Sequence, residues 1–281
     1  MRFTDPAEFY QQASPFLLAR EADHNLILGL CADLMRNRFL YGSDPPYFAA
    51  VEQTGSVVAA ALMTPPFRPA LSHVEAPEAL ALLAADLAAE YQTLPGVLGP
   101  KPHSEAFAAL WQQPRGQTYH LGRAMRIFQL TRVRPVRGVP GRLRRATGAD
   151  RELLVEWFGA FQREALGEDD DTGVAQSIER WLTGADRALY LWEDGQPVSM
   201  AGAGGPTPHG IRISAVFTPP ERRRRGYASA LVAAASQEQL DGGRRFCFLF
   251  TDLGNPTSNH IYQEIGYQPV CDMDEYHFGQ G

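Results

Sequence analysis

The chain of 281 residues is poor in cysteine and in long apolar runs, and each of these shortages excludes a class of protein. Its three cysteines, Cys31, Cys247 and Cys271, lie far apart and form no Cys-x-x-Cys pair, so the sequence indicates neither a disulfide framework nor a zinc site. No run approaches the roughly 18 apolar residues that span a membrane, and the N-terminal sequence lacks a signal-peptide core. We therefore expect a reduced, cytoplasmic protein with no metal and no membrane association.

Charge and composition further limit the class of protein. The formal net charge is −6, which argues against a general nucleic-acid-binding protein. Arginine supplies the basic residues apart from Lys101, the only lysine. The 44% hydrophobic and 21% charged residues are typical of a soluble globular protein. The length leaves room for two domains of ordinary size.

Hydrophobic periodicity divides the first half into helices and short strands. We expect helix within residues 1–40, a β-hairpin from Tyr47–Val51 and Ser56–Met63, a helix over Pro77–Tyr91, a strand at Gly96–Gly99, a helix over Ser104–Gln112 and an extended segment at Tyr119–Val133.

A basic stretch at 132–146 marks the boundary between the halves, with arginines among prolines and glycines and no acidic residue. A linker or edge strand is the plain interpretation, and a strip that touches RNA or a membrane is the alternative. Thr147–Asp150 then has the form of a capping box that begins a helix.

The second half repeats the order of elements in the first. We expect a helix after Asp150, an acidic loop at 168–171, a helix near 174–182, a hairpin at 188–203, a strand at 211–217 followed by a helix, a buried strand at Phe246–Phe250, a helix from Asn255–Pro256 to Ile265, and strands over Tyr267–Phe278. The fold class is therefore α/β, with two tandem domains, 1–134 and 135–281, each a mixed, mostly antiparallel twisted sheet flanked by helices.

The stretch 211–229, IRISAVFTPPERRRRGYAS, combines an alternating strand, a turn with four arginines and the start of an Ala-rich helix. The first amides of a helix lack internal partners and lie at the positive end of its dipole, so they favour an anion such as a pyrophosphate. Gly226 allows close approach of a ligand to the backbone. The first half has no such Arg-x-x-Gly-x-Ala turn, so we expect one anion cradle in the protein.

Two motifs in the second half resemble the GNAT superfamily of acetyltransferases. Arg223-Arg224-Arg225-Gly226-Tyr227-Ala228 is similar to the family's [Gln/Arg]-x-x-Gly-x-[Gly/Ala], and TDLGNPTSNHIYQEIGYQP at 251–269 is similar to its Asn…Tyr-x-x-x-Gly-[Phe/Tyr] segment. The motifs cover roughly 60 residues, and the order of elements extends the likeness to about 140–281. The first half is interpreted as a degenerate unit of the same kind, without the cofactor loop.

The resemblance implies acetyl-CoA as cofactor, with CoA as product. By position, it implies contacts to the pantetheine arm from Val216, Phe217 and Thr218, to the pyrophosphate and other phosphates from Arg223, Arg224, Arg225, Gly226, Tyr227, Ala228 and Ser229, and to the cofactor's arm from Asn255 and Ser258. It also implies that Tyr262 protonates the leaving thiolate, unless this residue is only a packed helix tyrosine.

The resemblance implies direct acetyl transfer to a primary amine of a small molecule or peptide, by positioning and oxyanion stabilisation. The general base stays open among Glu193, Asp194, His209, Ser214, Glu275, His277 and an ordered water. The acidic loop at 168–171 is a hypothetical acceptor border that attracts amines, or else a solvated loop. A non-catalytic acyl-CoA-binding module and an RNA-associated protein are the alternatives, and a homodimer is left open.

Overall fold

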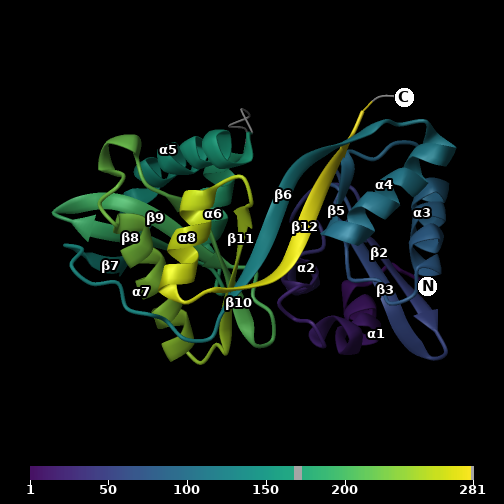
Figure 1. The fold of residues 1–281 in the computed structure, drawn as a ribbon, viewed down its shortest axis with the longest axis horizontal. Helices are drawn as coiled ribbons and strands as arrows, with labels where there is room; N and C mark the ends of the chain where they lie inside the picture. The colour runs from purple at the N-terminus through teal and green to yellow at the C-terminus, as the bar shows by residue number, and fades with distance from the viewer. Residues whose placement is uncertain (168–172, 280–281) are drawn as a thin grey trace. The chain divides into compact units, whose positions relative to one another are not determined.

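The computed structural model describes residues 1–167 and 173–279, and the chain forms two compact units (Figure 1). Unit 1 comprises residues 1–128, 250–256 and 269–281, and unit 2 comprises residues 129–249 and 257–268. Within the described residues, no helix combines the length and the apolar character that crossing a membrane requires.

The same order of elements occurs twice along the chain. The first series is β1 (Arg2–Phe3), α1 (Pro6–Leu18), α2 (Asn25–Arg36), β2 (Tyr47–Gln53), β3 (Ser56–Met63), β4 (Ala70–Leu71), α3 (Glu78–Glu90), β5 (Gly96–Pro100), α4 (Lys101–Arg115) and β6 (Tyr119–Leu130). The second is β7 (Arg142–Arg145), α5 (Arg151–Phe161), α6 (Val174–Thr183), β8 (Ala188–Asp194), β9 (Gln196–Gly204), β10 (Gly210–Phe217), α7 (Tyr227–Asp241), β11 (Phe246–Asp252), α8 (Pro256–Ile265) and β12 (Gln268–Phe278). This order confirms two tandem α/β units.

The sheet of unit 1 contains a strand from the far end of the chain. Its order is β1-β2-β3-β4-β5-β12-β6, and β12 pairs with β5 in antiparallel register from Met273–Pro100 to His277–Gly96 (Figure 1). The compact units therefore differ from the division into 1–134 and 135–281, because strand pairing places residues 269–281 in the first unit. Hydrophobic periodicity identifies a strand but does not select its partner.

Helices cover both faces of this sheet. Along β2, the buried Tyr47 and Ala49 share a core with α3 and α4, whereas Phe48 and Ala50 share another with α1 and α2. Successive side chains of a strand point to opposite faces, so a run that is apolar at every position fits a sheet buried on both sides.

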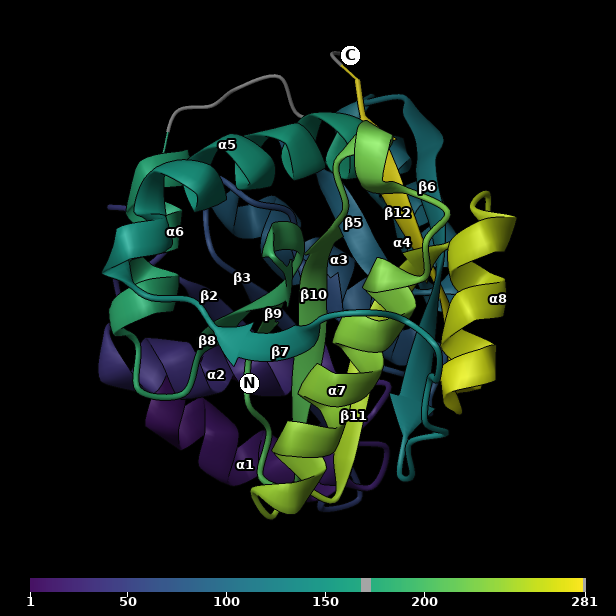
Figure 2. The ribbon, with the colours of Figure 1, turned by 90° about the vertical axis from the view of Figure 1, so that its left-hand side faces the viewer.

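Unit 2 has the strand order β11-β10-β9-β8-β7, with helices on both faces (Figure 2). Leu189 and Leu191 of β8 share a core with Leu154 and Trp157 of α5 and with Ile178 of α6. Tyr190, between them on the strand, points to the opposite face, where its hydroxyl donates to Glu238 of α7 at 2.9 Å. The sheet of unit 2 therefore has α5 and α6 on one face and α7 on the other.

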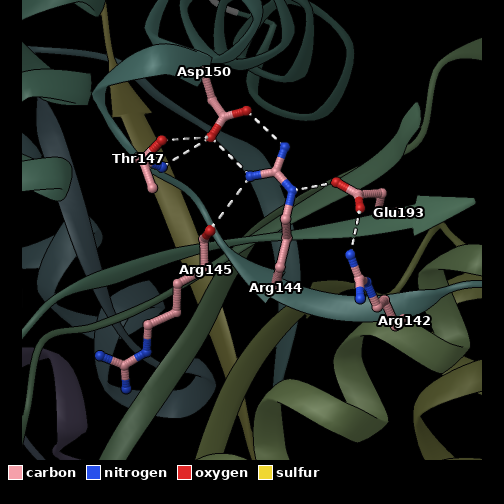
Figure 3. Close-up of polar contacts among 6 residues, drawn as sticks. All are labelled: Arg142, Arg144, Arg145, Thr147, Asp150 and Glu193. Carbon is pink, nitrogen blue, oxygen red and sulfur yellow. Dashed lines mark hydrogen bonds and ion pairs between the residues drawn. The ribbon is translucent and has the colours of Figure 1, made fainter. Parts of the chain in front are cut away.

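The last part of the basic stretch forms the edge strand β7, as its plain interpretation predicts, and Arg142, Arg144 and Arg145 of this strand are ion-paired (Figure 3). Arg144 makes a bidentate contact to Asp150, with N–O distances of 2.7 and 2.8 Å, and also contacts Glu193. Asp150 accepts the Thr147 amide at 2.8 Å and completes the predicted capping box at the start of α5. These contacts join β7, α5 and the β8–β9 hairpin.

Candidate functional site

Strand β10 loses its parallel neighbour halfway along its length. It pairs with β11 from Gly210 to Arg212, while its other edge follows β9 as far as Phe217. The register with β9 shifts between Ser214 and Phe217, and Ala215 has a φ of 51°, the geometry of a β-bulge that bends the strand. In the described part of the chain, no pairing with β11 continues past Arg212, so that edge offers backbone groups to a ligand.

The end of β10 is fixed by its own contacts. Phe217 is buried, with its ring centroid 6.2 Å from that of Trp157. The Ser199 hydroxyl donates to the Phe217 carbonyl oxygen at 3.0 Å and lies 2.8 Å from the Thr218 hydroxyl. Val216 is partly exposed. Of the predicted arm-binding positions, Phe217 and Thr218 are therefore held by contacts, and Val216 is partly exposed.

The turn after β10 presents a row of unpaired amides. After a short 3-10 turn at Pro220–Arg222, Arg224 and Gly226 take left-handed φ values of 60° and 79°. The first backbone bond of α7 runs from the Ala230 amide to the Gly226 carbonyl at 2.9 Å. Within the described residues, the amides of 224–229 have no backbone acceptor. Open amides at a helix N-terminus favour an anion.

The arginines of the turn differ in what their side chains do. The Arg223 guanidinium donates to the Thr218 carbonyl at 2.8 Å and to Glu164 at 2.6 Å. Arg224 and Arg225 are exposed and form no ion pair with any residue that the structure describes. Arg223 therefore shapes the turn, whereas Arg224 and Arg225 carry free positive charge beside the amides.

Gly226 and Tyr227 fix the start of α7. A Cβ on Gly226 would lie 2.8 Å from the Cγ2 of Val139, and the φ of +79° is strained for other residues. Tyr227 is buried, with its hydroxyl 2.7 Å from the Asp194 carboxylate. Ala228 and Ser229, the next two predicted cofactor contacts, are partly exposed. The Tyr227–Asp194 contact thus holds the start of α7 in place, while the amides of this first turn have no backbone acceptor among the described residues.

The second motif forms the turn after β11 and helix α8. Tyr262 packs edge-to-face against Tyr267, with ring centroids 6.0 Å apart and an interplanar angle of 66°, and its hydroxyl has no hydrogen-bond partner among the described residues. Burial raises the pKa of Tyr262 to about 12. Ser258 is partly exposed on the same helix, and Asn255 lies in segment 250–256, which belongs to unit 1.

Several residues considered as the general base have structural partners. Glu193 contacts Arg142 and Arg144, which hold the pKa of its carboxyl below the usual value, and Asp194 accepts from Tyr227. Glu275 is buried in unit 1, where its carboxylate contacts Arg68, Arg123 and His277. His209 lies against the ring of Phe246 at a centroid distance of 6.3 Å, and Ser214 is partly exposed on β10. The acidic loop at 168–171 lies outside the described residues.

The corresponding segment of unit 1 uses its amides internally. After β4, the amide of Ser72 donates to the Ala60 carbonyl and that of Glu75 to the Val58 carbonyl, both at 2.9 Å. The His73 amide donates to Nε2 of His24 at 3.0 Å, and Pro77, before α3, has no N–H. Three amides of this segment are therefore bonded internally, so it does not present the continuous row of open amides found in unit 2.

The structure also gathers three residues that the sequence does not connect. Asp23, His73 and Cys271 place a carboxylate oxygen, a ring nitrogen and a sulfur within 4.8 Å of one another. They are separated by 50 and 198 positions, so no spacing motif could reveal them.

Comparison with known proteins agrees with this geometry. Residues 151–267 match the model of the acetyltransferase (GNAT) family. Among solved structures, a Drosophila protein is similar over 99% of this chain and 97% of its own at 14% identity and a TM-score of 0.71.

Two further structures extend the likeness. A GNAT-family acetyltransferase from Colwellia psychrerythraea covers 100% of this chain and 99% of its own at 11% identity and a TM-score of 0.59. A tandem GNAT protein from the clavulanic acid biosynthesis pathway covers 90% and 87% at 16% identity and a TM-score of 0.56. No curated protein sequence matches the chain. Residues 151–267 are therefore a domain of the acetyltransferase (GNAT) family, within a chain that has the tandem GNAT fold.

Proposed function

We propose that the protein is an N-acetyltransferase that binds acetyl-CoA in unit 2. The row of unpaired amides at 224–229, at the end of a bulged strand with an open edge, is the observation that carries this proposal. The amides fit a pyrophosphate, and the backbone around Val216 fits the amide groups of a pantetheine arm. Arg224 and Arg225 add charge-assisted contacts to phosphates.

When bound, acetyl-CoA supplies the thioester acetyl group for direct transfer to an amine of a small molecule or peptide. A β10 amide stabilises the negative charge that develops on the carbonyl oxygen. Tyr262, with a pKa near 12, is protonated at neutral pH. Because a thiol has a pKa of about 8.5, such a phenol assists the leaving sulfur mainly by donating a hydrogen bond.

Unit 1 has no comparable cradle, because its corresponding amides at Ser72, His73 and Glu75 already have acceptors. We therefore assign cofactor binding to unit 2 alone. A cytoplasmic location and an acceptor amine are part of the same proposal.

Thermal unfolding with CoA, and release of CoA thiol across a panel of amines, test the proposal with the full chain. Bound CoA raises the unfolding temperature of a protein that binds it only when folded. We expect stabilisation together with amine-dependent thiol release. Stabilisation without release from any amine supports the non-catalytic acyl-CoA-binding module instead, and no stabilisation refutes both.

Replacing Tyr262→Phe isolates the hydrogen-bond role. A hydrogen bond to a charged group is worth about 1.5–3 kcal/mol, so kcat should fall about 10- to 100-fold while CoA affinity is retained. Tyr10→Phe, which changes a half-buried tyrosine of unit 1, is the matched control. An unchanged kcat in Tyr262→Phe would remove the assigned role without affecting cofactor binding.

A further inference from the structure

Three potential metal ligands meet in unit 1 from separate parts of the chain. Asp23 lies between α1 and α2, His73 follows β4, and Cys271 lies near the start of β12. Nε2 of His73 is 2.8 Å from Oδ2 of Asp23 and 3.7 Å from Sγ of Cys271. Each residue therefore directs one donor atom to a common point, with all of these atoms within 4.8 Å of one another.

The geometry differs from that of a nucleophilic triad. In a triad, one ring nitrogen contacts the nucleophile and the other contacts the orienting carboxylate. Here Asp23 and Cys271 both approach Nε2 of His73, so His73 cannot relay a proton from one to the other. A single cation between the three atoms would satisfy them together.

A hydrogen bond fixes the backbone at His73. The His73 amide donates to Nε2 of the buried His24 at 3.0 Å, and Nδ1 of His24 donates to the Leu17 carbonyl at 2.9 Å. Both nitrogens of His24 are thus engaged with backbone groups. His24 supports the position of His73 rather than offering a fourth ligand.

The cluster opens on a hollow in unit 1. A cavity of about 560 Å³ is lined by His73 and Cys271 together with Lys101, Arg126 and Asp272, among others. Arg126 makes a two-point contact to Asp272 at 2.6 and 2.9 Å, whereas Lys101 forms no ion pair with any residue that the structure describes. A ligand bound at the cluster would have both space and a positive neighbour.

We propose that Asp23, His73 and Cys271 bind one divalent ion of the zinc type, with a fourth position facing the hollow and held by water. Imidazole nitrogen and thiolate favour zinc over magnesium or calcium. The carboxylate and thiolate together balance the charge of the ion, and binding releases the Cys271 proton to solvent. Three protein ligands with an open position are the arrangement of zinc sites that bind a further ligand.

The ion would also join β12 to the first series of elements. Cys271 precedes the β12 residues that pair with β5, and Asp23 and His73 belong to the first series of elements. Of the three ligands, His73 lies in the segment after β4, which corresponds in the order of elements to the turn after β10. Because all three ligands belong to unit 1, the metal site does not depend on the function proposed for unit 2.

Metal titration of the untagged full chain, prepared metal-free under reducing conditions, tests the proposal. We expect one Zn²⁺ per chain by equilibrium dialysis, and a Co²⁺ complex with thiolate-to-metal charge-transfer absorption. Cys271→Ser should abolish that absorption, and Cys271→Ser or Asp23→Asn should weaken Zn²⁺ binding at least about tenfold. His260→Gln, on the surface of unit 2, is the control and should bind like the wild type.

The wild-type protein alone can overturn the proposal, whatever the variants do to folding. Absence of stoichiometric Zn²⁺ at micromolar concentration, or a Co²⁺ complex without charge-transfer absorption, would refute it. Equal Zn²⁺ affinity in wild type and Cys271→Ser would do the same. A hydrogen-bonded cluster without metal would show no zinc-dependent rise in unfolding temperature.

Discussion

The ion pair between Arg144 and Asp150 should be a measurable source of stability for unit 2. Asp150 accepts two hydrogen bonds from Arg144 and one from the Thr147 amide, and its side chain is 11% exposed (Figure 3). These donors hold the pKa of its carboxyl at about 2, below the usual 3.8. Asp150→Asn removes the charge while keeping the size of the side chain.

The shift in pKa sets the magnitude and the pH dependence. At about 1.4 kcal/mol per pKa unit, the ionised Asp150 contributes about 2 kcal/mol to the free energy of unfolding. Because the folded-state pKa is the lower one, this contribution is fully present well above pH 3.8 and is lost as the pH falls through about 2. About half of it should remain near pH 3.

Urea unfolding at pH 7 and pH 3, followed by tryptophan fluorescence, measures this difference between wild type and Asp150→Asn. Trp157, Trp181 and Trp192 lie in unit 2, so its transition can be followed even where the two units unfold separately. Glu156→Gln, an exposed change in the middle of α5, should stay within about 0.5 kcal/mol of wild type. A loss below about 0.5 kcal/mol in Asp150→Asn at pH 7 would refute the reasoning.

Two further predictions concern the cofactor turn and the C-terminal strand. Exposed ion pairs contribute about 0.2–1 kcal/mol each, so the double variant Arg224→Gln/Arg225→Gln should weaken CoA binding about 2- to 30-fold at low salt, less at high salt. Calorimetry measures this, and wild-type affinity at low salt would contradict it. Deleting residues 268–281 should expose the β5 amides to hydrogen exchange, since β5 loses its β12 partner, whereas deleting 280–281 should not. Full protection of β5 in the shorter chain would contradict the observed pairing.

Local sequence patterns predicted most of the elements. The hairpin at Tyr47–Val51 and Ser56–Met63 appears as β2 and β3, and Asn255–Pro256 does lead into a helix that ends at Ile265. Such patterns depend on neighbours within a few residues, which the sequence contains. The placement of β12 beside β5 depends on a partner more than 160 residues away, and no periodicity encodes it.

In the candidate site, too, the sequence does not show contacts between residues far apart along the chain. The motif around Gly226 identified the turn and its amides, because an anion site at a helix start has a local signature. The sequence could not show that Arg223 is occupied by Glu164, or that Asp194 holds Tyr227, because these partners come from other elements. The local pattern therefore predicts the same role for Arg223, Arg224 and Arg225, whereas the structure gives Arg223 internal partners.

The two series of elements differ in how the amides after the corresponding strands, β4 and β10, find hydrogen-bond acceptors. Amides that have neither a protein partner nor water cost free energy, so a segment either bonds them internally or presents them to solvent and ligand. Unit 1 bonds them, through Ser72, His73 and Glu75, and that choice fixes His73 beside Asp23 and Cys271. Unit 2 leaves the row at 224–229 open. The hydrogen bonds that close the anion cradle in the first unit are thus the same ones that hold its cluster of metal-ligand side chains in place, which is why we expect the two units to bind different things at equivalent positions.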